Sequence, residues 1–345
     1  MFDAPNTKIK NIDIAIVGFG NVGRSLAKLI VYKRQVLEDK FNLRINVKAI
    51  FDSKGAVVKE EGFSNYELLK LTEIPRSKIS EFENGLRGAS LKEIYDKIKP
   101  NIHVELTPSN YIDGEPSTSN ILTALNLDCN VVTATKSPLV LHYDEIFSLT
   151  KKKGLKVKFR GTVMGGTPFI DLLMSLKSYE IIKVEGILNA TTNFILSTMY
   201  EKLISYEQAL AEAKAIGVAE ADPSIDIKGI DAAAKLIIIG RLLGKRISLD
   251  KVERDDISKL TLNDIINSIK ENRVIKYIAT IDESSASVKL RSLEKSDPLA
   301  NINGTTNAVR IVTDSGDLFF VGKGGGGMET AHSVLDDIIS IGVSS

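Results

Sequence analysis

The chain of 345 residues contains a single cysteine, no tryptophan and only three histidines. Cys129 cannot form a disulfide within the chain, which agrees with a reducing compartment, and metal sites built from several cysteines are excluded. Cys129 also has no obvious activating partner, so we expect a small core residue and not a nucleophile. His103, His142 and His332 lack the spacing of metal ligands. We therefore assign the histidines structural roles and expect no metal-binding residue.

Charge of one sign is also lacking, because 45 Lys and Arg residues face 44 Asp and Glu residues, for a net charge of +1. No global field therefore favours nucleic acid or an anionic membrane. No stretch reaches the roughly 18 uncharged apolar residues of a membrane-spanning helix, and the first ten residues, MFDAPNTKIK, resemble no targeting signal. We expect a cytoplasmic protein that acts on a small molecule, without nucleic-acid or membrane partners.

Short β-branched runs alternate with helical patterns over the first 160 residues. The run at residues 12–17 leads into GFGNVG and then into apolar residues at helical spacing. Further strands are predicted at 45–51, 102–106, 131–134 and 157–159, with helices at 119–127 and 143–152. This alternation predicts an α/β fold, a doubly wound parallel sheet of the Rossmann type.

The pattern changes after Gly161 and favours a second domain with an α+β fold. Helices are predicted at 168–178, 205–216 and 228–243, and strands at 182–188, 273–281, 286–293, 306–313 and 317–321. The last four strands are interpreted as a meander, mostly antiparallel. A final helix at 330–340 follows a cluster of glycines.

The glycines of GFGNVG are Gly18, Gly20 and Gly23, and they lie between a buried strand and a helix. Small residues there let the backbone approach a pyrophosphate, and the helix N-terminus favours an anion, so we predict dinucleotide binding. Asp52 ends the next strand, where a carboxylate would accept hydrogen bonds from the ribose of NAD and repel the extra phosphate of NADP. The neighbouring Ser53, Lys54 and Lys59 favour NADP instead, unless the lysines belong to a solvated loop.

Four acidic residues and one lysine crowd the segment GVAEADPSIDIKGIDAAAKL: Glu220, Asp222, Asp226, Asp231 and Lys235. Asp231 and Lys235 are four residues apart on a predicted helix, so they share a face and could form a plain ion pair. The surrounding residues are apolar, however, and burial lowers a lysine pKa while a close carboxylate raises it. A lysine in that setting suits proton transfer.

Lys136 follows the predicted strand at 131–134, at the sheet edge where open α/β sheets bind ligands. A lysine there could contact a cofactor or a carboxylate, although ordinary loop lysines occur at such places too.

The residues together resemble the homoserine dehydrogenase family over nearly the whole chain. The resemblance rests on GFGNVG, ELTP with DGEPS, VVTATKSPL, GTVMGGTPFI, GILNATTNFIL, GVAEADPSIDIKGIDAAAKL and PLANINGTTNAV with GKGGGG. Members of this family interconvert L-homoserine and L-aspartate 4-semialdehyde with NAD or NADP, on the route to threonine and methionine. The chain is similar to the short monofunctional form, and we expect neither an aspartokinase nor a regulatory domain.

The resemblance also implies how the chain is divided. Residues 1–160 with 321–345 would form the NAD(P)-binding domain, which the last helix completes. Residues 161–320 would form the domain for substrate binding, catalysis and dimerisation, so a homodimer is implied.

Site roles follow from the same resemblance, position by position. It implies that Lys235 is the catalytic lysine, that Asp231 is its partner and that Lys136 lies near nicotinamide and substrate. Substrate-binding roles fall on Glu220, Asp226, Ala190 and Thr191. Cofactor-binding roles fall on Gly18, Phe19, Gly20, Asn21, Val22, Gly23, Asp52, Ser53, Lys54, Thr107, Pro108, Lys136 and Gly326.

Arg160 is a departure from the family pattern, which has a glutamate at this position. In the family this glutamate and backbone carbonyls, here those of Val163, Gly165 and Thr167, hold a monovalent cation. An arginine cannot ligate a cation. Either the site is lost, or the guanidinium takes the place of the ion and donates to those carbonyls, and we favour the second.

Two other functions compete with this interpretation. An aspartate-semialdehyde dehydrogenase acts on the same aldehyde but needs a thioester-forming cysteine, and Cys129 is poorly placed for that role. A non-catalytic nucleotide-sensing protein would keep the glycine turn but would have no need for the cluster from Glu220 to Lys235.

Overall fold

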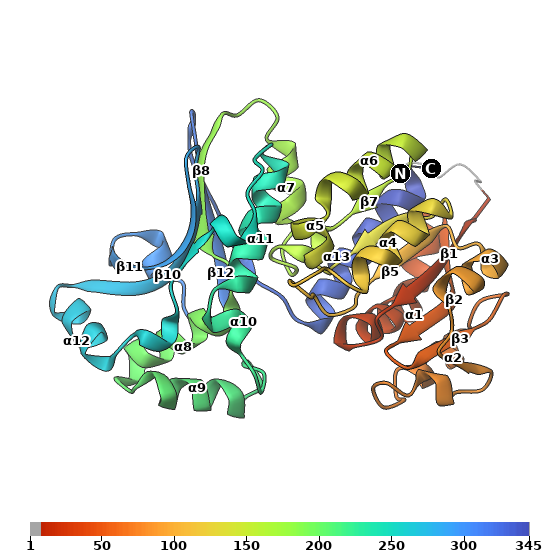
Figure 1. Cartoon of the computed structure of the whole chain (residues 1–345), viewed down its shortest axis with the longest axis horizontal. Helices are drawn as coiled ribbons and strands as arrows, with labels where there is room; N and C mark the ends of the chain where they lie inside the picture. Colours follow the sequence, from red (N-terminus) through yellow and green to blue (C-terminus); the bar gives the residue numbers. More distant parts are fainter. Residues whose placement is uncertain (1–7, 345) are drawn as a thin grey trace. The chain divides into compact units, whose positions relative to one another are not determined.

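The computed structural model describes residues 8–344, which pack as two compact units (Figure 1). Unit 1 comprises Met1–Thr162 and Gly326–Ser345, and unit 2 comprises Val163–Gly325. The boundaries lie slightly beyond the predicted residues 160 and 320. Each unit has its own sheet.

The sheet of unit 1 has seven strands in the order β4-β3-β2-β1-β5-β6-β7. Its strands are β1 (Lys10–Val17), β2 (Leu43–Asp52), β3 (Gly55–Val58), β4 (Gly85–Arg87), β5 (Ile102–Glu105), β6 (Asn130–Thr133) and β7 (Val157–Lys158). The five neighbouring strands β2, β1, β5, β6 and β7 are parallel, which confirms the Rossmann-type prediction. The two short strands β3 and β4 pair antiparallel at one edge and were not predicted.

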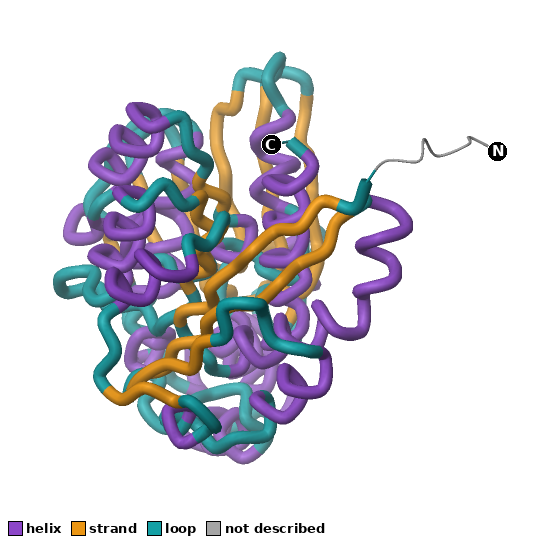
Figure 2. The backbone as a smooth tube through the Cα atoms, turned by 90° about the vertical axis from the view of Figure 1, so that its right-hand side faces the viewer, coloured by secondary structure: helices purple, strands orange, loops and turns teal. Residues whose placement is uncertain are grey.

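Helices cover both faces of this sheet (Figure 2). The helices of unit 1 are α1 (Asn21–Phe41), α2 (Asn65–Leu71), α3 (Leu91–Ile98), α4 (Ser117–Asn126), α5 (Ser137–Leu141), α6 (Tyr143–Lys153) and α13 (Gly327–Val343). Apolar residues of α1 and α13, such as Leu26 and Ile338, share one buried core with β1, β2 and β5. The last helix thus belongs to the first unit.

The sheet of unit 2 has six strands in the order β13-β12-β8-β10-β11-β9. Its strands are β8 (Ile181–Ile187), β9 (Glu253–Arg254), β10 (Arg273–Ile281), β11 (Ala286–Glu294), β12 (Thr306–Thr313) and β13 (Gly316–Lys323). The mostly antiparallel sheet is confirmed, but the predicted meander is wrong in one respect. Strand β8 lies between β10 and β12 and pairs antiparallel with both, so two hairpins flank it.

The helices of unit 2 are α7 (Phe169–Ser175), α8 (Ala190–Lys202), α9 (Tyr206–Ala215), α10 (Ser224–Ile227), α11 (Ile230–Leu242) and α12 (Leu262–Lys270). Short 3-10 turns complete the chain at Ile79–Glu81, Arg160–Thr162, Leu249–Lys251, Ile257–Lys259 and Pro298–Asn301. Helix α11 is buried continuously from Ala232 to Gly240, as its apolar sequence requires.

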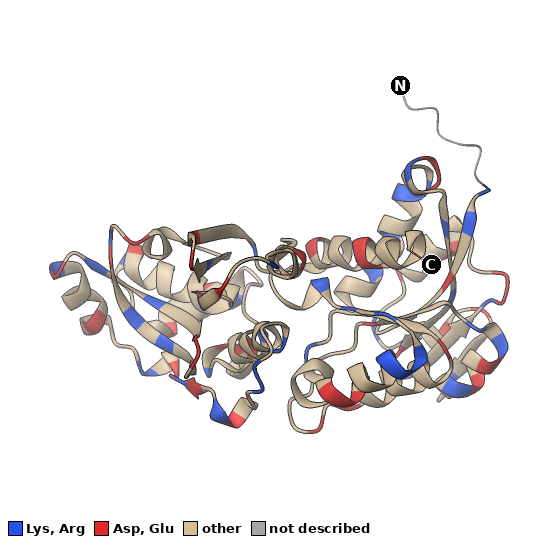
Figure 3. Ribbon diagram, turned by 90° about the horizontal axis from the view of Figure 1, so that it is seen from above, with Lys and Arg blue, Asp and Glu red and all other residues tan. Residues whose placement is uncertain are grey.

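Charged residues of both signs are interspersed along the elements of both units (Figure 3), in keeping with the net charge of +1. Within residues 8–344, no helix has the length and apolar character to cross a membrane.

Lys276 on β10 is a buried charge in unit 2, with 1% of its surface exposed. Its Nζ donates to the carbonyl oxygen of Ile302 and, at 2.8 Å, to Oδ1 of Asn303. Burial lowers the pKa of Lys276 to about 8. The lysine thus fastens the loop before β12 to the sheet.

This buried lysine predicts a pH-dependent stability. Between about pH 8 and 10.5 the unfolded chain binds a proton on Lys276 that the folded chain does not, so the free energy of unfolding rises with pH in this window. The rise approaches about 3 kcal/mol across the window. We expect the difference in unfolding free energy between the natural chain and Lys276→Met, measured by urea denaturation at pH 7 and pH 10, to shift in favour of the natural chain at pH 10. A difference independent of pH would contradict the assignment.

Candidate nucleotide-binding turn and catalytic cluster

The carboxyl ends of β1 and β5 lie side by side in unit 1, with β2 on the other side of β1. This is the point in a doubly wound sheet where ligands bind. Gly18 has a φ of +100°, and a Cβ built on it would lie 2.4 Å from the carbonyl carbon of Leu106 and 2.6 Å from the nitrogen of Thr107. The close approach of the two strand ends therefore requires glycine.

The other two glycines of the turn differ in what they face. A Cβ on Gly23 would lie 2.4 Å from the carbonyl oxygen of Gly18, so packing within the turn excludes a side chain. A Cβ on Gly20 would meet no atom within 4 Å. Gly20 is the N-cap of α1 and has no side-chain cap. The open space before a long helix fits the pyrophosphate of a dinucleotide, which the free amides and the helix dipole would favour.

Two other predicted cofactor contacts, Phe19 and Val22, turn their side chains into the core of unit 1. Phe19 is buried and can reach a cofactor only through its backbone, whereas Val22 is partly exposed. Gly326, the N-cap of α13, belongs to the same region. A Cβ on the next residue, Gly327, would lie 3.3 Å from the carbonyl oxygen of Asn21. The structure therefore brings Gly326 to the glycine turn.

Two loops at the carboxyl edge are tied together by hydroxyl groups. The hydroxyl of Thr135 donates to the carbonyl of Thr107 at 2.6 Å, and the backbone nitrogen of Lys136 donates to Oγ of Ser109 at 2.9 Å. Pro108 lies between these contacts and is exposed. The predicted residues Thr107, Pro108 and Lys136 therefore come together beside the glycine turn.

Asp52 does not present a free carboxylate to a ribose. One oxygen accepts from the backbone nitrogens of Lys54 at 2.8 Å and Gly55 at 3.2 Å, and the other accepts from the nitrogen of Ile79 at 2.9 Å. Asp52 thus holds the turn between β2 and β3 against the loop before residue 79. The expected direct role in choosing between NAD and NADP is weakened, because most of the acceptor capacity is already used.

Among the basic residues near Asp52, Lys59 lies beyond β3, opposite Lys48 in the middle of β2, and pairs with Glu67 at 2.7 Å. It therefore lies away from the carboxyl edge. Lys54 is exposed at that edge. Arg76, which the sequence analysis missed, donates to Oδ1 of Asn21 in the glycine turn at 2.7 Å. The basic sequence RSK at 76–78 was the only signal.

In unit 2, the cluster around Lys235 lies at the first turns of α11. Nζ of Lys235 lies 2.8 Å from Oδ2 of Asp231 and donates to the carbonyl oxygen of Leu188 at 2.5 Å. Lys235 is 7% exposed. The exposed surface pair that the sequence left open is therefore excluded, and the apolar α11 holds an ammonium group among few solvent contacts.

Asn189 joins two carboxylates to this lysine. Its Nδ2 donates to Oδ1 of Asp226 at 2.6 Å and to Oδ2 of Asp231 at 3.0 Å. Its Oδ1 accepts from the nitrogen of Thr192 at 2.9 Å and so caps α8. Burial, and then the charge of Asp231, raise the pKa of Asp226. The sequence analysis missed Asn189, although an asparagine before a helix in LNATTN is a typical N-cap.

The remaining predicted substrate residues divide into two groups. Ala190 and Thr191 form the first turn of α8, next to Asn189, and belong to the cluster. The hydroxyl of Thr191 donates to the carbonyl of Val218 at 3.2 Å. Glu220, two residues after Val218, lies on an exposed segment between α9 and α10. Within residues 8–344 its carboxylate forms no hydrogen bond or ion pair, so the structure does not bring it into the bonded cluster.

Cys129 is 1% exposed, and its thiol donates to the carbonyl of Pro100 at 3.1 Å. Burial raises the pKa of the Cys129 thiol to about 12. It precedes β6, at the amino edge of the sheet, opposite the glycine turn. A thiol held in this way is a poor nucleophile.

The guanidinium of Arg160 pairs with the acidic residues of α13. Nη1 lies 2.8 Å from Oδ2 of Asp336, and Nε lies 3.8 Å from Oδ1 of the buried Asp337. The negative charges of Asp336 and Asp337 balance the positive charge of Arg160 within unit 1. The substitution of an ion by the guanidinium remains a prediction.

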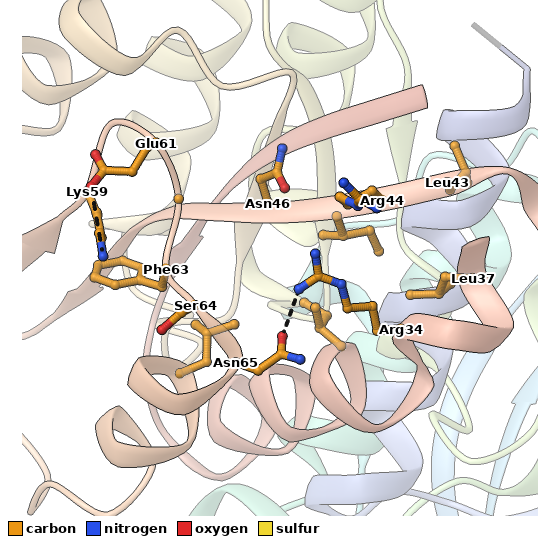
Figure 4. A pocket seen from close by; sticks show the side chains of 14 residues that line it. Arg34, Leu37, Leu43, Arg44, Asn46, Lys59, Glu61, Phe63, Ser64 and Asn65 are labelled. Carbon is orange, nitrogen blue, oxygen red and sulfur yellow. Dashed lines mark hydrogen bonds and ion pairs between the residues drawn. The ribbon is translucent and has the colours of Figure 1, made fainter. Parts of the chain in front are cut away.

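A groove of about 290 Å³ in unit 1 lies away from the glycine turn (Figure 4). Its walls come from the second half of α1, the first half of β2 and the segment from Lys59 to Leu68. Arg34 donates to Asn65 there, and Lys59 faces Glu61 (Figure 4). The groove is remote from the carboxyl edge and is not the cofactor site.

A Rossmann-type unit with an open glycine turn, and a second unit with a buried lysine paired with Asp231, are typical of an oxidoreductase that uses NAD or NADP. The comparisons with known proteins agree. Residues 168–339 match the homoserine dehydrogenase family model, and residues 1–135 match that of the glutamate/leucine/phenylalanine/valine dehydrogenases.

Relatives match over almost the whole chain. A homoserine dehydrogenase of Sulfurisphaera tokodaii is 36% identical over 94% of this chain and 97% of its own. An NAD(+)-dependent homoserine dehydrogenase of Pseudomonas canavaninivorans is 34% identical over 95% of each chain. The structure of a hyperthermophilic archaeal homoserine dehydrogenase mutant in complex with NADPH is 32% identical, with a TM-score of 0.83 over 97% of this chain and 99% of that one. The chain belongs to the homoserine dehydrogenase family.

The different surroundings of the glycines predict separable effects. Gly18→Ala should lower the free energy of unfolding by more than about 1 kcal/mol, because it combines a positive φ with a backbone clash. Gly20→Ala should leave the thermal midpoint nearly unchanged but weaken NADPH binding about tenfold or more, because the added methyl fills the open space. Fluorescence titration and thermal unfolding of both variants measure this. Unchanged NADPH affinity in Gly20→Ala would exclude the pyrophosphate from this turn.

Proposed function

We propose that the chain catalyses the reversible oxidation of L-homoserine to L-aspartate 4-semialdehyde with NAD or NADP, in the biosynthesis of threonine and methionine. The observation that carries this proposal is the contact set of Lys235. Its Nζ is bound by Asp231 and by the carbonyl of Leu188. Family membership supplies the substrate pair.

The two contacts of Nζ leave one tetrahedral position open. An ammonium group has three protons, of which two go to Asp231 and Leu188 and the third can go to the substrate oxygen. A neutral amine at the same place keeps two donors on these acceptors and directs its lone pair to the substrate hydroxyl. Lys235 can thus accept the hydroxyl proton in oxidation and return it in reduction without moving.

The bound dinucleotide supplies the other half of the chemistry, because it accepts the hydride from the carbinol carbon or donates it to the aldehyde. Lys136 follows β6 beside Thr107 and would add positive charge near the developing alkoxide. Asp231 holds the lysine in its orientation and balances its charge.

The substrate carries an ammonium group and a carboxylate, and unit 2 offers a complement to each. Asp226, bonded to Asn189, contributes negative charge for the ammonium group, with Glu220 as a second, exposed candidate. The backbone amides of Ala190 and Thr191 lie in the first turn of α8 and suit a carboxylate.

The two competing functions fit the site less well. An aspartate-semialdehyde dehydrogenase would need a reactive thiol, whereas Cys129 is buried and donates to Pro100. A nucleotide sensor would not need a lysine and an aspartate buried together, which are costly to desolvate.

Replacement of Lys235 tests the proton transfer directly. Lys235→Ala should lower kcat by about 10² to 10⁴, the usual contribution of a general acid or base. NADPH affinity should be retained, because the lysine acts on the proton and not on the pyrophosphate. Lys228→Ala, at an exposed lysine nearby, is the matched control and should keep natural turnover. Homoserine-dependent reduction of NAD and NADP is the assay, and near-natural turnover of Lys235→Ala would refute the role.

Both nucleotides should bind, and we propose that Arg76 and Lys54 together recruit the 2′-phosphate of NADP. Arg76 is held at the glycine turn through Asn21, while Asp52 is occupied by backbone amides. This revises the weight given to Lys59, which pairs with Glu67.

The affinities of three variants check this choice of residues. Arg76→Ala and Lys54→Ala should weaken NADP binding severalfold and leave NAD binding nearly unchanged, because only NADP carries the extra phosphate. Lys59→Ala serves as a control that should affect neither. An equal loss for both nucleotides in Arg76→Ala would instead assign Arg76 to the structure of the turn.

The proposal also covers the oligomeric state and the location of the protein in the cell. A homodimer through unit 2 is supported by exposed apolar side chains on its sheet, including Ile182 and Val321, and sedimentation of the purified chain would measure it. A cytoplasmic location also remains a prediction, which fractionation of cells would test.

A further inference from the structure

A buried carboxylate that has no part in the mechanism above lies directly below the nucleotide edge. Glu105 is the last residue of β5 and is fully buried. Its Oε1 accepts from both the nitrogen, at 3.0 Å, and the hydroxyl of Thr107. Its Oε2 accepts from Nδ2 of Asn120 at 3.1 Å and contacts Nε2 of His103 at 3.2 Å. Both oxygens therefore have two partners each.

The histidine continues the same chain of hydrogen bonds. Nδ1 of His103 lies 2.6 Å from the hydroxyl of Tyr95. When Nε2 carries the proton and donates to Glu105, a neutral ring leaves Nδ1 as the acceptor of the tyrosine proton. Four donors then converge on one carboxylate, which is the hydrogen bonding that a buried carboxylate requires.

The arrangement fixes every polar group of Thr107. Its nitrogen and hydroxyl donate to Glu105, and its carbonyl accepts from the hydroxyl of Thr135. The next residue, Pro108, has no N–H. All the donors of the segment Thr107–Pro108 are therefore bound within the protein, so at the crevice beside Gly18 it offers hydrocarbon and the carbonyl of Pro108 but no free N–H or hydroxyl.

We propose that Glu105 is a positioning residue for the cofactor: by binding both donors of Thr107, it presents Thr107–Pro108 as a fixed edge without free donors, against which the dinucleotide packs. Glu105 is too deeply buried to touch the cofactor itself. The inference rests on the nucleotide site proposed above and adds the way in which this edge is made.

Two physical effects make such an edge useful. An N–H and a hydroxyl exposed in the crevice would bind water, and an aromatic or sugar face that displaced this water would leave them unpaired. A loop that is already held by the three hydrogen bonds of Thr107 also loses little conformational freedom when the cofactor binds. Both effects strengthen binding without a new contact to the ligand.

Binding of NADPH to the full chain, measured by fluorescence titration, tests the proposal independently of turnover. Glu105→Ala releases both donors of Thr107 and should weaken NADPH binding about tenfold. Glu105→Gln should restore most of the affinity. Its amide oxygen can accept from Thr107, and its amide nitrogen can donate to a reoriented Asn120 or to the other tautomer of His103. Rescue by the isosteric amide is expected of positioning through hydrogen bonds.

Tyr95→Phe is the matched control, because it breaks the far end of the same buried chain and leaves the bonds to Thr107 in place. It should lower the thermal midpoint without changing NADPH affinity. Equal losses of affinity in Tyr95→Phe and Glu105→Ala would show a merely structural role and overturn the proposal, as would natural affinity in Glu105→Ala.

A second variant covers the case in which Glu105→Ala does not fold. Thr107→Val keeps the shape of the side chain but removes the hydroxyl donor to Glu105, and it should weaken NADPH binding severalfold. Natural affinity in this variant would then overturn the proposal. Failure of the nucleotide site itself has a different signature, because the natural chain would bind neither NADPH nor NADH.

Discussion

The contact between the carboxyl ends of β1 and β5 is the constraint on which the nucleotide-binding unit depends. The nitrogen of Leu106 donates to the carbonyl of Val17 at 2.7 Å, so the two strands stay paired to their last residues. The residue after β1 then lies so close to the backbone of Leu106 that it has no room for a side chain, so this position requires glycine, here Gly18. The direction of α1, the open turn at Gly20 and the place of Thr107 all follow from this contact.

The corresponding constraint in unit 2 is the burial of opposite charges in a small volume. Removing Lys235 or Asp231 from water is costly, and the attraction between them compensates only when further hydrogen bonds satisfy the remaining protons and lone pairs. Leu188 and Asn189 supply those bonds from the start of α8. The catalytic cluster is therefore part of the folding of α8 against α11, so that changes to its carboxylates act on stability as well as on chemistry.

Local patterns were enough to predict much of this architecture. The strand at 12–17, the glycine turn and the pairing of Asp231 with Lys235 are encoded within a few residues, so periodicity and spacing reveal them. Strand β8 could not be placed between β10 and β12 in this way, because its partners lie about a hundred residues further along the chain. The sequence 190–202 is rich in β-branched residues, and only its packing and the cap at Asn189 make it a helix.

The sequence analysis missed Arg76 for the same reason. Arg76 reaches Asn21 across 55 positions, and nothing local to either residue indicates the contact. Asp52 is the reverse case, because a carboxylate at the end of β2 is a typical ribose ligand. Its actual partners are the amides of residues 54, 55 and 79, and the last of these comes from a distant loop.

Across both units, the groups that remain available to ligands are those that the fold does not use. Glu105 and Asp52 are polar residues at the nucleotide edge, yet both spend their hydrogen-bonding capacity on the protein. By contrast, a Cβ on Gly20 would meet no atom within 4 Å, and Nζ of Lys235 has two protein partners for its three protons. A residue type at a strand end is therefore weak evidence of ligand contact until its partners are counted. Here that count leaves Asp52 with three backbone partners and supports the proposal that the exposed cations Lys54 and Arg76 recruit the 2′-phosphate.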